Sequence, residues 1–116
     1  MRFTEKNPPR AFGAAVEDSA PTLDCGDVTL DLGEQVTFVD SRTEAPHTDV
    51  TRKVWGYYLT RSCNERQKES GWRTAIIRNS MARTYVVMVS EEARQEFADF
   101  LDATSHVVVL WVDELD

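Results

Sequence analysis

Cysteine and histidine are scarce in this sequence: the 116 residues contain only Cys25, Cys63 and two histidines. Neither cysteine has a CxxC companion, and neither His47 nor His106 lies at ligand spacing from them. A structural zinc site needs four such ligands that converge on one point. The sequence therefore predicts no metal site, and nothing in it calls for a cofactor.

Long apolar runs are also absent. The longest, residues 107–112, is far shorter than the roughly 18 residues of a transmembrane helix. The opening segment carries three basic residues, but Pro8 and Pro9 interrupt it and it lacks the apolar stretch of a secretory signal. We therefore expect a soluble, cytoplasmic protein that does not contact membranes. The cysteine spacing permits one long-range disulfide, but a reducing compartment favours free thiols.

Motifs that carry nucleotide binding or hydrolysis are missing as well. The sequence holds no GxGxxG, GxxxxGK[ST], GxSxG or HExxH pattern. His47 lies close to Asp49, a pairing that can orient a general base, but no nucleophile accompanies them in the sequence. His106 opens an apolar segment and is interpreted as a structural histidine. These absences favour a protein that is not an enzyme.

What the sequence does contain suits one small globular domain. Its apolar content of 41% and its length of 116 residues are typical of a single hydrophobic core. Residues 1–22 mix proline, alanine and acidic residues with little periodicity, so they predict a flexible N-terminal arm or a segment that lies across the domain surface. The remaining residues, 23–116, are expected to form one domain.

Alternation of apolar and polar residues predicts several strands. Two polar segments, residues 40–51 and 61–71, are expected to be loops. The expected strands form a hairpin over residues 28–32 and 36–38, a single strand over 54–60, a second hairpin over 72–78 and 84–89, and a central strand over 107–112 that is apolar on both faces.

One amphipathic helix is expected between the last two strands. Ser90 is the predicted N-cap, and two glutamates follow it in the first turn, where the helix dipole favours negative charge. The helix is expected to end near Ala103, and its apolar face consists of Ala93, Phe97, Phe100 and Leu101.

These elements give an α+β fold with the order β-β-β-β-β-α-β. We expect a mostly antiparallel sheet of about six strands with one helix packed on one face. If the last strand runs parallel to residues 84–89, the crossover through the helix is expected to be right-handed. The other face of the sheet has no helix, so the arm, the long loops or a second copy of the protein must shield it.

The net charge of −7 is unevenly distributed. Residues 52–83 contain eight basic and two acidic residues, a balance of +6, so the rest of the chain carries −13. This asymmetry predicts one cationic region, suited to an anionic ligand or to a self-complementary partner. In the alternative interpretation, the charges point outward along the strands and only solvate them.

The segment from Lys53 to Arg73 combines two tryptophans and two tyrosines with five basic residues. Arginine pairs with phosphate or carboxylate, and aromatic faces stack on rings, so this mix can bind an anionic or planar ligand. The alternative is that the aromatic side chains belong to the core. Nucleic acid is not an expected partner, because the acidic remainder repels phosphate. The candidate ligand-binding residues are Tyr57, Tyr58, Arg61, Ser62, Asn64, Arg66 and Arg73.

Three functional hypotheses follow from these features. The first is a non-enzymatic binding or accessory domain, a homodimer or the partner of another protein, that associates through the uncovered sheet face or the basic edge. The second is a binding protein or enzyme for a phosphorylated or carboxylated metabolite, using residues 53–73. The third is that residues 1–22 capture a larger partner while the domain serves as a mount.

The runs WGYYLT, WRTAIIRN and TYVVMVS resemble segments of small bacterial proteins. The resemblance spans about residues 25–114 and implies a stand-alone bacterial domain. It implies no particular activity, cofactor or binding site.

Overall fold

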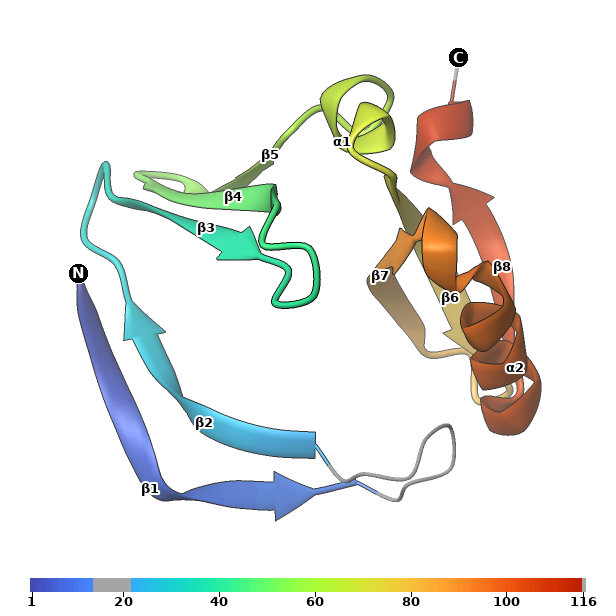
Figure 1. Ribbon diagram of the computed structural model, residues 1–116, viewed down its shortest axis with the longest axis horizontal. Coiled ribbons are helices and arrows are strands. Elements are labelled where there is room, and N and C mark those ends of the chain that lie inside the picture. The colour runs from blue at the N-terminus through green and yellow to red at the C-terminus, as the bar shows by residue number, and fades with distance from the viewer. Residues whose placement is uncertain (14–21, 116) are drawn as a thin grey trace.

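The computed structural model describes residues 1–13 and 22–115. In these residues the chain forms eight strands, arranged as three antiparallel sheets, and one main helix. Figure 1 shows the three sheets set apart from one another, with the main helix beside the third sheet. The predicted α+β class, with mostly antiparallel strands, is confirmed.

The first two sheets are built from the N-terminal half of the chain. A two-stranded hairpin pairs β1 (Arg2–Phe12) with β2 (Thr22–Thr29). The second sheet has the order β3-β4-β5 and leads into the short helix α1 (Arg66–Glu69). Its strands are β3 (Gln35–Val39), β4 (Pro46–Lys53) and β5 (Gly56–Thr60).

The third sheet has the order β7-β6-β8, with β6 (Trp72–Asn79) between β7 (Thr84–Ser90) and β8 (His106–Trp111). Both outer strands are antiparallel to β6, so they point in the same direction. The connection between them passes through a 3-10 turn and the helix, and a second 3-10 turn follows β8. These elements are η1 (Glu91–Ala93), α2 (Arg94–Thr104) and η2 (Val112–Glu114).

The predicted hairpin over residues 28–32 and 36–38 is wrong. β2 pairs with β1, and β3 pairs with β4. Leu32 and Gly33 do form a turn, closed by the Glu34 amide, which donates to Asp31 at 3.0 Å, but this turn does not pair β2 with β3. The Gly33 amide donates instead to the carbonyl of Arg52, 2.9 Å away, while the Arg52 amide donates to Glu34. The two alternating segments are therefore strands of different sheets, although they are neighbours in the sequence.

Two further segments differ from the expectation. Residues 40–51 include most of β4, because Thr48, Val50 and Thr51 pair with β3 and β5 despite the polar sequence around them. Residues 2–12 form a strand in place of an irregular segment, and a shift of register between Glu5 and Arg10 explains why no clear alternation is seen. Residues 14–21 of the expected arm lie outside the described residues, and the boundary at residue 22 stays a prediction.

The C-terminal half follows the sequence more closely. The hairpin over residues 72–78 and 84–89 is confirmed as β6 and β7. The expected helix is present, but it starts through η1, and Ser90 makes no capping hydrogen bond with its side chain. The segment 107–112 is an edge strand rather than a central one, since β8 pairs with β6 alone.

The buried core is small and lies on β6 and β7. Ala75, Ile77 and Val89 are the buried apolar residues among those described, and all three belong to the face of the third sheet that α2 covers. The chain exposes 8349 Å² of surface, whereas a compact monomer of 13.2 kDa exposes roughly 6,400 Å². Its Cα radius of gyration is 15.7 Å, against about 13 Å for a compact domain of this length. The fold is therefore unusually open.

A few specific contacts join the second and third sheets. The hydroxyl of Thr48, which is buried, lies 3.0 Å from the sulfur of Met88, and the ring of His47 stacks on Trp72 with centroids 4.4 Å apart. Beside them, the Thr74 hydroxyl donates to the buried side chain of Gln67 on α1. These contacts hold the sheets together near the start of β6.

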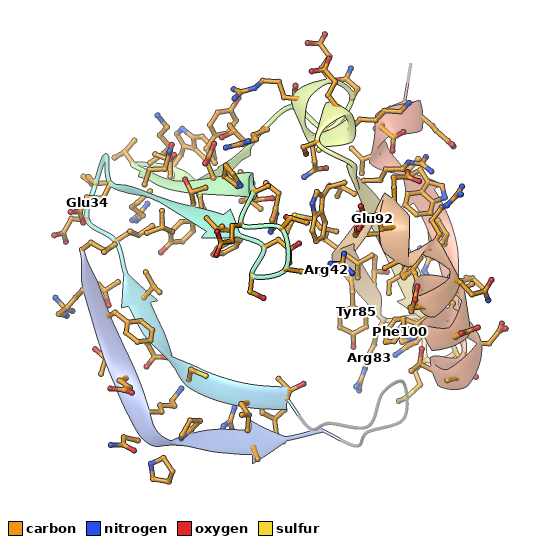
Figure 2. The ribbon with its side chains drawn as sticks, in the orientation of Figure 1. Glu34, Arg42, Arg83, Tyr85, Glu92 and Phe100 are labelled. Atoms are coloured by element: carbon orange, nitrogen blue, oxygen red, sulfur yellow. The ribbon has the colours of Figure 1, made fainter. Side chains whose placement is uncertain are left out.

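An ion pair lies at the edge of the same junction. Figure 2 shows Arg42, on the loop between β3 and β4, pointing toward Glu92 on η1, and their charged groups are 3.6 Å apart. Both side chains are exposed, so the pair contributes little to stability. The pair shows that the loop between β3 and β4 lies close to η1.

The position of Ile77 at the centre of the core gives a direct test of the fold. Ile77→Ala should lower the free energy of unfolding by about 2–5 kcal/mol, because it removes buried methyl groups and leaves a cavity. Urea denaturation followed by circular dichroism measures this change. Val54→Ala, at a side chain that is 82% exposed, is the control and should change stability by less than about 0.5 kcal/mol. Equal losses in the two variants would contradict this location of the core.

Candidate interaction surface

The two tyrosines of the predicted ligand site lie next to each other on β5, so they point to opposite faces of the second sheet. Both are exposed. The Arg52 guanidinium lies over the Tyr57 ring, 5.5 Å from its centroid, and the Tyr58 ring meets the edge of Trp55 at 6.1 Å. The two tyrosines therefore do not form one stacking platform.

The next four residues of the predicted site lie in the connection from β5 to α1 and at the first residue of α1, which is Arg66. Arg61 donates to the carbonyl of Pro46 at 3.1 Å and pairs with Asp49 at 3.6 Å. The Ser62 hydroxyl accepts a hydrogen bond from the amide of Arg66, so it supports the first turn of α1. Asn64 is exposed in the same connection. Arg61 and Ser62 thus have structural partners within the chain.

Arg73, the last residue of the predicted site, lies apart from the others in a cluster with the C-terminal acids. Its Nε is 3.0 Å from Asp113, and its Nη2 is 3.1 Å from Glu114. Its guanidinium also lies over the Trp111 ring, 4.1 Å from the centroid. Lys68 reaches Asp113 from the other side at 3.5 Å. Part of the cationic segment is therefore already neutralised by carboxylates of this chain.

The charges of this cluster shift each other's protonation. Burial would raise the pKa of Asp113, whose side chain is fully enclosed, but the hydrogen bond and positive charge of Arg73 outweigh burial and hold its pKa below the ordinary value. The pKa of Arg73 is raised, chiefly by its hydrogen bond to Asp113. Both groups are therefore charged at neutral pH, and the pair links β6 to η2.

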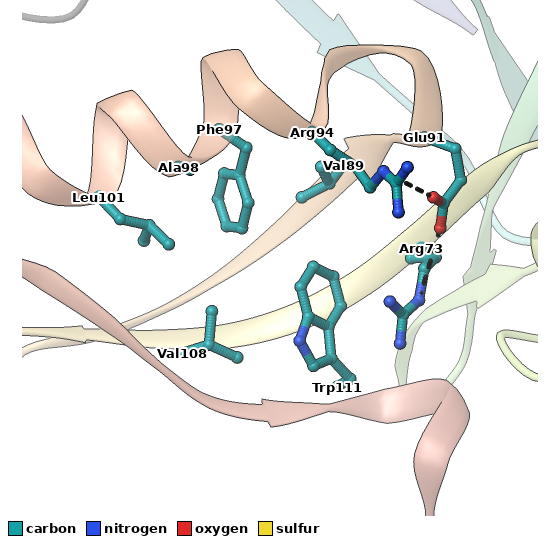
Figure 3. A pocket seen from close by; sticks show the side chains of 9 residues that line it. All are labelled: Arg73, Val89, Glu91, Arg94, Phe97, Ala98, Leu101, Val108 and Trp111. Carbon is teal, nitrogen blue, oxygen red and sulfur yellow. Dashed lines mark ion pairs between the residues drawn. The ribbon is translucent and has the colours of Figure 1, made fainter.

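A pocket of about 240 Å³ lies between α2 and the third sheet (Figure 3). Phe97 and Leu101 of the helix face Val108 and Trp111 across it, and the ion-paired side chains of Glu91 and Arg94 lie at one end, 3.6 Å apart. The described lining has no hydroxyl, thiol or imidazole group. The pocket can hold a small apolar group, and Glu91, the one carboxylate of its described lining, is paired with Arg94 and Arg73.

The opposite face of the third sheet carries apolar side chains with little cover. Val86, Ile76 and Leu110 lie directly opposite one another across β7, β6 and β8, so their side chains share a face. Val107 belongs to the same face, because it pairs with Arg78, two residues beyond Ile76 on β6. We call this surface the open face and define it by Ile76, Val86, Val107 and Leu110.

The second sheet covers the open face only at one end, where Thr48 meets Met88. Beyond this contact, Val86 is 65% exposed and Val107 is 63% exposed. Val86 also borders a small cavity beside Leu59 of β5, another exposed apolar side chain. The expectation that one sheet face lacks a helix therefore holds for the third sheet.

The residues of the open face were not among the predicted site residues. The signal that points to them is the apolar pattern of residues 107–112 on both faces, which was interpreted as a central strand covered on each side. The other chemical candidates are engaged elsewhere. His47 stacks on Trp72, whereas Asp49 accepts a hydrogen bond from Thr37 at 2.6 Å, which lowers its pKa.

Other kinds of site find no support in the part of the chain that the structure describes. No group of three or more His, Cys, Asp or Glu side chains is placed to hold a metal ion. None of the described helices is long and apolar enough to cross a membrane. Cys25 and Cys63 are both free thiols, and Cys25 is exposed.

Comparison with protein-family models, with curated proteins and with solved structures finds no match for this chain. The resemblance to small bacterial proteins therefore stays untested. The open face is therefore the feature on which the functional proposal depends.

The cluster of Arg73 and Asp113 predicts a defined response to pH. Because the pKa of Asp113 is lowered in the folded protein, its ionised form stabilises the fold above its unfolded pKa of about 3.9, and this contribution is lost as pH falls through the lower folded pKa. Asp113→Asn should therefore cost about 2 kcal/mol at pH 7 and less at pH 3.

Chemical denaturation at pH 7 and at pH 3 measures both changes. Asp102→Asn, at an exposed carboxylate of α2, is the control and should leave stability nearly unchanged at both values. If Asp113→Asn lost the same stability at both pH values, the ionised carboxylate would not be the source of the effect.

Proposed function

We propose that this protein is a non-enzymatic accessory domain that acts as a homodimer, associating through the open face of its third sheet. The observation that carries the proposal is an apolar sheet face that lies exposed beside a very small core. Val86 and Val107 stand on it, more than 60% exposed. Exposed apolar side chains that share one sheet face are typical of an interaction site.

The surface area of the chain supports a second copy as the occupant. The chain exposes about 1,900 Å² more than a compact monomer of its mass. A stable protein interface buries about 800 Å² on each partner, so the excess is more than twice what a dimer requires. Association of two copies can therefore return the exposed fraction to the range of compact proteins.

The sequence of the third sheet supports the same conclusion. Residues 107–112 read VVVLWV, and β7 carries Val86 and Val87 in succession, so both strands are apolar on both faces. Such strands are typical of sheets that are covered on two sides. Helix α2 covers one side, and a partner copy supplies the second cover.

The metabolite-binding alternative has weaker support. Its two central arginines, Arg61 and Arg73, are already paired with Asp49 and with Asp113 and Glu114. An anion would have to displace these carboxylates. In addition, the two tyrosines lie on opposite faces of the second sheet, so the seven residues do not converge on one pocket.

We also propose that the protein works in a reducing compartment such as the cytoplasm. Cys25 is exposed and unpaired, and an exposed free thiol persists best where thiols are kept reduced. The four residues that define the open face include no cysteine, so the chemistry of that face does not depend on oxidation.

Substitution of Val86 tests the proposed interface. Val86→Glu should shift the molar mass in solution from about 26 kDa, twice the 13.2 kDa of one chain, to 13.2 kDa, because a carboxylate cannot be buried against a partner's apolar face without a large cost. Light scattering coupled to size-exclusion chromatography measures the mass. Since Val86 is exposed in the single chain, the variant should fold normally.

The matched control is Val54→Glu, which makes the same change at an exposed valine outside the open face. It should keep the mass of the parent protein. A Val86→Glu variant that stays folded and dimeric would exclude the open face as the interface, and loss of the dimer in both variants would show only a general effect of added charge.

A further inference from the structure

We propose that the open face of one copy is covered by the β1–β2 hairpin of the other, so that the two copies exchange hairpins. This inference rests on the proposed function and goes beyond it, because it names the segment that occupies the interface. The alternative, in which two open faces pack directly against each other, makes a different prediction for mixed variants.

The hairpin lacks a core of its own. A two-stranded hairpin is marginally stable by itself in water and needs a further layer against its apolar side chains. β1 and β2 pack chiefly on each other. Figure 1 shows them leaving the second sheet as an arm that bends midway and runs toward the side of the molecule where the third sheet lies. Their large apolar side chains are exposed: Phe3, Phe12 and Val28 on one face of the hairpin, and Leu23 on the other.

The hairpin is nonetheless well formed internally. Phe3 and Val28 lie directly opposite each other, and the Phe3 ring lies so close to Gly26 that a Cβ there would clash. Lys6 donates to Asp24 at 2.7 Å and to Asp27 at 3.3 Å. These contacts fix the shape of the hairpin without burying its apolar residues. Those side chains therefore remain available for contact with another surface.

Its base is anchored to the second sheet. The N-terminal amino group lies 2.7 Å from the Glu34 carboxylate, and Gly33 and Glu34 exchange backbone hydrogen bonds with Arg52 of β4. The 11 residues of β1 would span at most roughly 35 Å at the usual rise per residue, and Figure 1 shows the strand bent midway, so its end-to-end reach is shorter. An anchored element of this length can still contact a neighbouring copy.

Exchange between two copies also gives a closed assembly. In a twofold dimer each copy donates one hairpin and receives one, so two identical contacts form and neither copy is left with a free hairpin or an open face. The apolar side chains of the hairpin and those of the open face then cover each other. Direct packing of two open faces would leave both hairpins exposed.

Mixing two defective variants tests the exchange. Phe12→Glu damages the hairpin and leaves the open face intact, whereas Val86→Glu does the reverse. Each variant alone should self-associate roughly 100-fold more weakly than the parent chain. An equimolar mixture should regain dimers, with a Kd at least about tenfold below that of either variant, because the mixed pair retains one intact contact. Sedimentation velocity with one variant fluorescently labelled measures the pairing.

The outcomes separate the two proposals. A parent chain that is monomeric would overturn both. A dimeric parent whose Phe12→Glu variant also stays dimeric, or a mixture that stays as monomeric as its components, would overturn the exchange and leave direct pairing of the open faces. Val54→Glu, mixed with either variant, is the control: its hairpin and open face are both intact, and it should pair with each through one contact.

A second measurement does not depend on these substitutions. A photo-crosslinker attached to Cys25, which is exposed on β2, should react with residues of the third sheet of the other copy in a Cys63→Ser background. Mixing ¹⁵N-labelled and unlabelled protein identifies crosslinks between copies by mass spectrometry. Crosslinks confined to single copies would overturn the exchange.

Discussion

Strand β6 is the element on which the rest of the structure depends. It pairs with β7 on one side and β8 on the other, and it supplies Ala75 and Ile77 to the core beneath α2. Its first residues also join the sheets, because Trp72 stacks on His47 and Thr74 bonds to Gln67. Through Arg73 it holds η2 by way of Asp113. One strand therefore organises the helix, the second sheet and the C-terminus, while its face bearing Ile76 has little cover of its own.

That imbalance explains the proposed function physically. A sheet that is apolar on two sides needs two covering layers, and the described part of this chain supplies one helix. The β1–β2 hairpin has exposed apolar side chains and no core of its own, so it also needs a covering layer. If two copies exchange hairpins, each hairpin covers the open face of the other copy, so the same contact forms twice. This association needs no cofactor or catalytic group.

The sequence predicted the C-terminal half of the fold well because its signals are local. The β6–β7 hairpin and α2 are encoded by alternation and by helical spacing within short segments. The N-terminal half was mispredicted because pairing there joins residues that local patterns do not connect. β2 pairs back to β1, and the polar strand β4 is held by partners on both sides rather than by an apolar face.

The predicted site was limited by a similar cause. Arginines and tyrosines close together in sequence suggested one pocket, but strand geometry places Tyr57 and Tyr58 on opposite faces, and the acids that bind Arg73 come from the far end of the chain. The apolar pattern of residues 107–112 did contain relevant information. It was interpreted as cover within one chain, whereas the structure leaves that face exposed.

The most direct test of this account is sedimentation equilibrium of the unmodified chain over a wide range of concentrations. We expect a species of about 26 kDa, twice the chain mass of 13.2 kDa, that dissociates reversibly to the single chain on dilution. A mass of 13.2 kDa at every concentration, with the protein folded, would contradict the claim that a second copy covers the open face.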